Sequence, residues 1–214
     1  MRKWLAGMAV IGLVFDLSLV FAQEGNIHEA AVLISDDQLI PGEIYVPKGK
    51  DLRLNVLNIR KNQGQFNVPG IKETFILKPG KVQIVDIPET LLTDGAKCEF
   101  SCKKTHFSAS STIVRDIPAD KPLEIAVIGI WKNFLPGVIE IPADVPMVLR
   151  LYAQAKSPHS DFEIYGTDVK LPFSLKKITS VELPEGLKPG TYPISRPKFP
   201  NQNHGIKSKF VVSE

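Results

Sequence analysis

Apolar and polar residues alternate over short segments throughout most of this chain, and almost no stretch shows the period of an amphipathic helix. Residues 52–57 alternate cleanly, with their apolar side chains on one face. Residues 75–77 lead into a Lys-Pro-Gly turn signal, after which an apolar pattern resumes over 82–87. The chain has 17 prolines and 15 glycines. Many short strands between such turns predict an all-β protein, either a sandwich or a barrel.

The pattern also repeats along the chain. Residues 39–47 are echoed by residues 134–142, and Pro41 and Pro136 lie 95 positions apart. An alternating strand follows each segment. Three later landmarks recur in the same order: Phe75 and Phe173, Pro88 and Pro184, His106 and His204. A period of this length indicates a duplicated domain. We therefore predict two tandem β-sandwiches, residues 23–117 and 118–214. The alternative to a duplication is that the two halves look alike by chance, because Pro-Gly turns separate the strands in both.

The first 22 residues differ from the rest. Arg2 and Lys3 precede an apolar run over residues 4–22, which Asp16 and Ser18 interrupt, and small residues occupy the last and third-last positions. This arrangement is typical of a secretory signal peptide that is cleaved before Gln23. We expect a periplasmic or secreted protein. An uncleaved membrane anchor is the alternative, because the run is nearly long enough to span a bilayer.

Charge and motif content exclude several function classes. The chain has 26 basic and 23 acidic residues, a net charge of +3. These charges are interspersed, so we expect no nucleic-acid partner. The sequence contains no Gly-x-Ser-x-Gly, no phosphate-binding glycine loop and no His-Glu-x-x-His. The serine-rich segment 108–111 is interpreted as a loop before a strand. We expect no enzymatic activity.

The candidate chemistry lies in residues 98–106. Cys98 and Cys102 are the only two cysteines of the chain, and His106 completes a Cys-x3-Cys-x3-His spacing. Two thiols and an imidazole suit a soft or borderline metal such as copper or zinc. In an exported protein the two cysteines can instead form a disulfide. Such a short bridge would stabilise little. A thiol-based redox enzyme is a third interpretation.

This pattern resembles the cupredoxins, in particular the copper A domain of cytochrome oxidase subunit II and nitrous oxide reductase. That family carries Cys-x3-Cys-x3-His-x2-Met in its last loop and His-x-Phe-x-Val-Pro in an earlier one. The spacing of Cys98, Cys102 and His106 fits the first motif. Residues 65–69, Gln-Phe-Asn-Val-Pro, fit the second from the Phe onward. The resemblance covers residues 42–115 and implies a Greek-key sandwich with copper held in a loop between the last two strands.

Two ligands of the family are replaced in this chain. Gly64 stands where the first His would be, and Ala109 where the Met would be. The resemblance implies that the two thiolates and the imidazole form a mononuclear copper site suited to Cu(I). The family also uses a backbone carbonyl, which here would be that of Phe100. Gln63, Gln65 or solvent would complete the coordination.

The second half is similar to the cupredoxin-like domain of some periplasmic copper- and iron-handling proteins. His159 takes the place of the first His of that family and His204 that of the second, while residues 194–196 lack the expected Cys. The resemblance makes both imidazoles candidates for a second metal site. In a strand, Asp161 and Glu163 would share a face with His159. They either join this site or form an exposed polar face.

These observations lead to one functional hypothesis and one alternative. The hypothesis is an exported copper protein that carries copper or transfers electrons, with a periplasmic or membrane-bound redox or copper-handling partner. The alternative is a metal-free cupredoxin that serves as an interaction module of an envelope complex. Lys103 and Lys104 could lower the cysteine pKa values or dock an acidic partner, but we interpret them as an ordinary pair of surface lysines. His28 is interpreted as a solvated residue.

Overall fold

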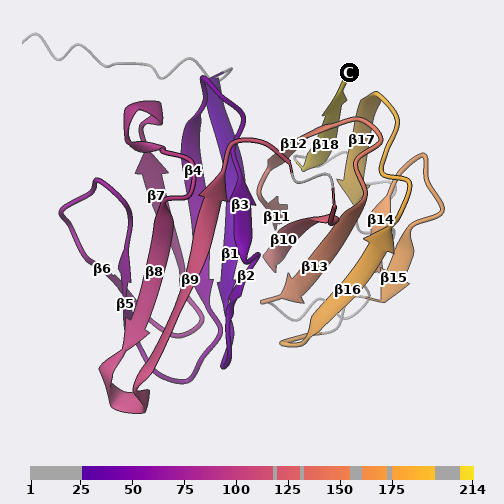
Figure 1. The fold of residues 1–214 in the computed structure, drawn as a ribbon. Helices are drawn as coiled ribbons and strands as arrows, with labels where there is room; N and C mark the ends of the chain where they lie inside the picture. The colour runs from indigo at the N-terminus through magenta and orange to yellow at the C-terminus, as the bar shows by residue number, and fades with distance from the viewer. Residues whose placement is uncertain (1–25, 118–119, 131–132, 155–160, 173–174, 196–207) are drawn as a thin grey trace, which may run out of the picture.

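The computed structural model describes residues 26–117, 120–130, 133–154, 161–172, 175–195 and 208–214. Strands dominate this part of the chain and form two β-sandwiches side by side (Figure 1). The tandem β-sandwich prediction is confirmed. The predicted boundary between residues 117 and 118 stays a prediction, because residues 118–119 lie outside the described part. No helix in the described residues has the length and apolar character that crossing a membrane requires.

The first sandwich is formed by nine strands and two short 3-10 helices. The strands are β1 (Ile27–Ile34), β2 (Leu39–Ile40), β3 (Glu43–Tyr45), β4 (Asp51–Asn58), β5 (Gly64–Asn67), β6 (Phe75–Leu77), β7 (Val82–Ile87), β8 (Lys97–Cys102) and β9 (Phe107–Val114). The helices are η2 (Glu89–Leu91) and η3 (Lys103–Thr105). One sheet has the order β2-β1-β4-β7, and the other has the order β3-β9-β8-β5-β6.

The second sandwich repeats this plan. Its strands are β10 (Leu123–Ile130), β11 (Asn133–Leu135), β12 (Val138–Pro142), β13 (Met147–Ala153), β14 (Asp161–Ile164), β15 (Lys170–Pro172), β16 (Ile178–Leu183), β17 (Gly190–Ser195) and β18 (Lys209–Ser213). The sheet orders are β11-β10-β13-β16 and β12-β18-β17-β14-β15. Each strand therefore occupies the place of the strand nine positions earlier, as expected for a duplicated domain.

Each sandwich encloses its own apolar core between its two sheets. The alternation predicted for residues 52–57 places Leu52, Leu54 and Val56 in the first core, where all three are fully or almost fully buried. In the second domain, Met147, Leu149 and Leu151 alternate along β13 in the same way and are buried in the second core. One prediction was wrong, because residues 108–111 belong to β9 and are not a loop. There Ser111 is buried and its hydroxyl donates to the carbonyl of Pro41 at 2.6 Å.

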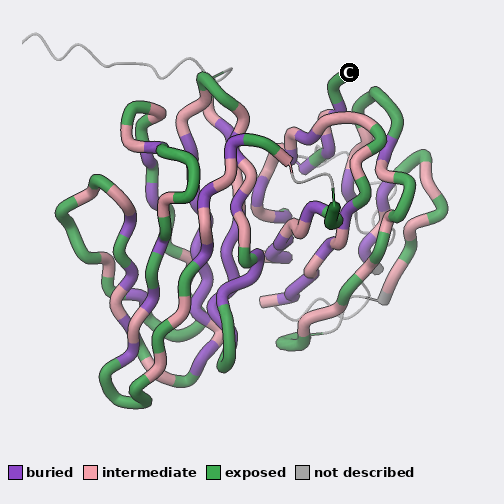
Figure 2. Tube along the Cα trace, viewed as in Figure 1, coloured by how far each residue is buried: buried purple, intermediate pink, exposed green. Residues whose placement is uncertain are grey.

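A third apolar cluster joins the two domains. It combines residues of the first sandwich, such as Leu33, with residues of the second, such as Ile128. Figure 2 shows long buried stretches along the strands between the sandwiches, which include β1 and β10. Both faces of these strands are covered, because one packs inside its domain and the other packs across the interface. The two domains therefore form one continuous packed unit.

The duplication extends to the polar contacts of this interface. The backbone N–H of Gly42 donates to Glu124 Oε2 at 3.1 Å, and the N–H of Gly137 donates to Glu29 Oε2 at 2.8 Å. The members of these two contacts are related by the same 95-residue offset as Pro41 and Pro136. Equivalent faces of the two domains therefore contact each other in a roughly twofold arrangement.

His28 departs from the prediction that it is solvated. It lies in β1 and is only 4% exposed, with Nδ1 3.7 Å from Glu140 Oε2 of the second domain and the ring edge against Tyr45. Lys50 Nζ is 3.5 Å from the same carboxylate oxygen. The close approach of His28, followed by the charge of Lys50, holds the pKa of Glu140 below its ordinary value. The sequence pattern of β1 did not reveal this contact because it crosses the domain interface.

Candidate functional site

The stretch that carries both cysteines is a strand and not the predicted loop. Cys98, Phe100 and Cys102 alternate along β8 with more exposed residues, and their side chains enter the first core. β8 pairs with β9 over its whole length, from Lys97 to Cys102, and with β5 on its other side. The apolar alternation therefore outweighed the ligand spacing as a guide to structure.

The strand separates the two thiols. Residues four positions apart in an extended strand lie about 13 Å apart at their Cα atoms. A disulfide needs Cα atoms within about 7 Å. Two thiolates on one metal ion need their sulfur atoms within about 4.6 Å of each other, because each metal–sulfur bond is about 2.3 Å long. Both cysteines are free thiols, and both are buried, at 0% exposure for Cys98 and 2% for Cys102. The structure therefore does not bring the two predicted thiolate ligands together.

His106 lies at the tight end of the β8–β9 hairpin. It follows η3 and has a φ of 50°, a left-handed conformation. Its N–H donates to the carbonyl of Lys103 at 3.4 Å, and its side chain is exposed. The same hairpin pairs Cys102 with Phe107. His106 is thus close to Cys102 along the hairpin and remote from Cys98.

The place of the family's first His is filled by a phenylalanine. A Cβ on Gly64 would lie 2.2 Å from Cζ of Phe100, 2.4 Å from its Cε2 and 2.6 Å from the carbonyl oxygen of Ser101. Real Cβ atoms do not approach other atoms this closely, so no side chain fits at position 64 without rearrangement. Gly64 is buried, and Phe100 packs directly over it. Ala109, the other replaced position, pairs with Phe100 across the β8–β9 ladder.

A buried arginine continues this packing toward the end of the domain. The ring of Phe100 contacts that of Phe107 at 6.1 Å between centroids, and the guanidinium carbon of Arg60 lies 3.8 Å from the centroid of Phe107. Arg60 is 7% exposed. Its Nη1 donates to the carbonyls of Ser35 and Asp36 at 3.0 and 2.6 Å, and its Nη2 donates to Thr105 at 3.1 Å. The end of the sandwich is therefore closed by a cation stacked on an aromatic ring.

The two thiols differ in their electrostatics. Burial among apolar side chains raises the pKa of Cys98 to about 12. The side chain of Thr105 lowers the pKa of Cys102, and the backbone N–H groups of Thr105 and Lys104 and the charge of Arg60 act in the same direction. Cys98 is therefore a neutral thiol at physiological pH when no metal ion is bound to it.

This geometry decides whether the side chains of the first domain could coordinate a copper ion. Cys98 and Cys102 are separated along a strand. The ring of Phe100 fills the space beside Gly64, where the family has its first His. The backbone of Phe100 belongs to the ladder between β8 and β9. Among the residues that the structure describes, no three His, Cys, Asp or Glu side chains come close enough to hold a metal ion. The residues of the first domain do not fit a copper ion in this arrangement.

His159 and His204 lie outside the described residues, and so does the side chain of Asp161. Glu163 is partly buried in β14 and pairs with Lys170 of β15 and Ser195 of β17. The second metal site stays a prediction.

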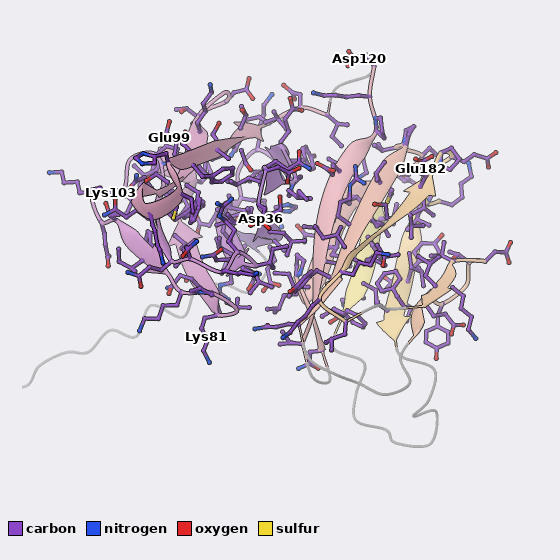
Figure 3. All side chains as sticks on the ribbon, turned by 90° about the horizontal axis from the view of Figure 1, so that it is seen from below. Asp36, Lys81, Glu99, Lys103, Asp120 and Glu182 are labelled. Carbon is purple, nitrogen blue, oxygen red and sulfur yellow. The ribbon has the colours of Figure 1, made fainter. Side chains whose placement is uncertain are left out.

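The structure instead reveals a hollow of about 600 Å³ on the outer face of the first domain. Its floor is the row of Ile76, Gln65 and Ser101, which pair in register across β6, β5 and β8. Exposed lysines surround this row: Lys61, Lys103 and Lys104. Figure 3 shows Lys103 at the end of the first domain that points away from the second. This hollow could not be predicted from the sequence, because its floor forms only when β6, β5 and β8 pair.

Comparisons with known proteins found distant similarities to solved structures. No protein-family model matches the sequence, and no curated protein matches it either. A solved copper binding protein in its apo form is similar at 16% identity and a TM-score of 0.36, over 45% of this chain and 93% of that one. A multicopper oxidase is similar at 14% identity and a TM-score of 0.31, over 87% and 89%. A copper-containing nitrite reductase from Thermus scotoductus is similar at 12% identity and 0.28, over 87% and 68%.

These three neighbours are named as copper proteins. At identities of 12–16% and TM-scores of 0.28–0.36, the likeness carries no argument about the metal content or the function of this chain.

Proposed function

We propose that this chain is a protein-binding module built on two cupredoxin-like sandwiches, whose first domain holds packed side chains where related domains hold copper. The observation that carries this proposal is the contact of Phe100 with Gly64. A ligand side chain at position 64 and the Phe100 ring exclude each other, because a Cβ there would lie 2.2 Å from the ring. In the folded domain, no ligand side chain at position 64 can therefore reach the predicted copper site.

The strand geometry supports the same conclusion. Cys98 and Cys102 could share one ion only if β8 left its ladders with β5 and β9. Each backbone hydrogen bond lost in this way costs about 0.5–1.5 kcal/mol, and Phe100 would also leave the core. Breaking several such bonds would cost several kcal/mol. Copper carriage through this Cys-x3-Cys-x3-His stretch would have to overcome this cost.

The hollow on the outer face supplies the surface that a binding module needs. It lies on a rigid sheet, at the end of the domain that the second sandwich leaves free. If the signal peptide directs the chain out of the cytoplasm, the partner is a protein of the periplasm or envelope. This function corresponds to the alternative that the sequence left open.

Titration with Cu(I) tests the metal-free part of this proposal. The reduced mature protein would compete for Cu(I) with a colorimetric chelator, beside the Cys98→Ser and His106→Ala variants. We expect no stoichiometric uptake that depends on Cys98, since this residue is buried in the core and is held apart from Cys102 along β8. Uptake of one equivalent that Cys98→Ser and His106→Ala both abolish would overturn the proposal.

A further inference from the structure

The hollow of the first domain has a consistent chemistry. Its floor combines the half-exposed side chain of Ile76, at 50% exposure, with the amide of Gln65 and the hydroxyl of Ser101. These residues stand on the face of the sheet opposite to Phe66 and Phe100, which are buried. Regular strand pairing fixes the floor, so a ligand meets a preformed surface.

The rim of the hollow is basic on two sides. Lys61 comes from the connection between β4 and β5, and Lys103 and Lys104 come from η3. No carboxylate lines the hollow; the nearest acid along β8, Glu99, lies outside it. Three exposed cations without a counter-charge around a concave surface create a positive local potential. The net charge of +3 for the whole chain is too small to indicate this concentration.

The lining also decides which anion fits best. Ile76 offers an apolar contact, and Gln63 and Gln65 offer amide donors and acceptors of the kind that a peptide backbone uses. No aromatic side chain lines the hollow for stacking of bases, which single-stranded nucleic acids require. A polypeptide that carries both carboxylates and aliphatic side chains matches both features.

We infer that this hollow binds an acidic segment of a partner protein, with carboxylates against Lys61, Lys103 and Lys104 and an aliphatic side chain on Ile76. The inference deepens the proposed function and rests on it, since it names the chemistry of the partner. It also gives a role to the lysine pair that the sequence alone left as ordinary surface residues.

The test measures binding of a labelled synthetic peptide of alternating Glu and Val to the full mature chain by fluorescence anisotropy at low salt. In the first test variant, Lys61, Lys103 and Lys104 are all changed to Glu, and the second test variant is Ile76→Ser. The matched control reverses three exposed lysines of the second domain: Lys170, Lys177 and Lys209.

We expect the triple change in the hollow to weaken binding about tenfold, because each exposed ion pair contributes a factor of about two. We expect Ile76→Ser to weaken binding without changing its salt dependence, and the control variant to bind as the unmodified chain does. The isosteric peptide of alternating Gln and Val should bind far more weakly.

Several results would overturn the inference. One is the absence of binding by the Glu-Val peptide, and another is an equal loss of affinity in the control variant. The inference also fails if an oligothymidylate of equal charge, or vesicles with anionic lipids, bind at least as tightly as the peptide and lose affinity with the same lysines. Circular dichroism of each variant establishes that it is folded.

This experiment is separate from the copper titration. Uptake of copper that depends on Cys98, together with peptide binding at the hollow, would refute the metal-free function and leave the surface assignment intact. Absence of both copper uptake and peptide binding would refute the surface assignment alone.

Discussion

The closure of the first domain by Phe100 leads to a quantitative prediction for the substitution Gly64→Ala. Alanine normally stabilises a strand relative to glycine, because it restricts the unfolded chain. Here the added methyl group would lie 2.2 Å from the ring of Phe100 and 2.6 Å from the carbonyl oxygen of Ser101. The ring is only 1% exposed, so it has little room to move.

The magnitude follows from the cost of overpacking a core. Forcing one extra methyl group into a packed interior costs about 1–3 kcal/mol. A loss of about 2 kcal/mol lowers the Tm of a chain of this size by about 4–8 °C. The carbonyl of Ser101 is backbone and cannot rotate away, so part of the cost must persist whatever residue stands at position 100.

Urea unfolding followed by far-UV circular dichroism measures this cost for Gly64→Ala, Phe100→Ala and the double variant. Phe100→Ala alone should cost about 3–5 kcal/mol because it leaves a cavity. The double variant should be about 1 kcal/mol more stable than the sum of the single changes predicts, since the methyl group enters that cavity.

Gly42→Ala is a suitable control, because a Cβ there meets nothing within 4 Å. It should change the stability by less than about 1 kcal/mol. A neutral or stabilising effect of Gly64→Ala would show that the space beside β5 is open. The argument for a closed metal site would then be refuted.

Three further predictions concern the thiols, the partly buried Glu140 and the buried Arg60. In the folded protein, mass spectrometry after brief alkylation should find Cys102 modified before Cys98, because the pKa of Cys102 is lowered and that of Cys98 is raised. Mild oxidation should form no bond between them, and equal alkylation rates would contradict the opposite pKa shifts. Glu140→Gln should cost about 1 kcal/mol near neutral pH. Because the close approach of His28 and the charge of Lys50 depress the pKa of this carboxyl, its contribution is present above the unfolded value of about 4.5 and is lost as the pH falls through the lower folded value. Thermal unfolding across this range should therefore show the two proteins converging at acidic pH, and a constant difference would refute the pairing. Arg60→Lys should cost about 2–3 kcal/mol in urea unfolding, because lysine cannot reproduce its buried hydrogen bonds and its contact with the aromatic ring; an unchanged midpoint would refute this role.

The site shows where interpretation from sequence was insufficient. The spacing of Cys98, Cys102 and His106 is the same whether the residues form a loop or a strand, but the distance between the thiols differs greatly between the two. The alternation of Cys98, Phe100 and Cys102 with polar neighbours already favoured a strand. The Cys-x3-Cys-x3-His spacing predicted a loop, and the alternation was the better guide to the structure.

The sequence by itself determined the all-β class, the duplication and most of the strands, because alternation and turn residues are local properties that each strand must satisfy. It also located the two positions, Gly64 and Ala109, at which the family's ligands are replaced. Only the tertiary structure decided what fills that space, since the contact of Phe100 with Gly64 joins residues that are distant in the chain. The same holds for the contact of the buried His28 with the partly exposed Glu140 and for the lysine-lined hollow. Each depends on which strands pair and how the two domains pack, and the hydrophobic pattern of a single segment does not contain that information.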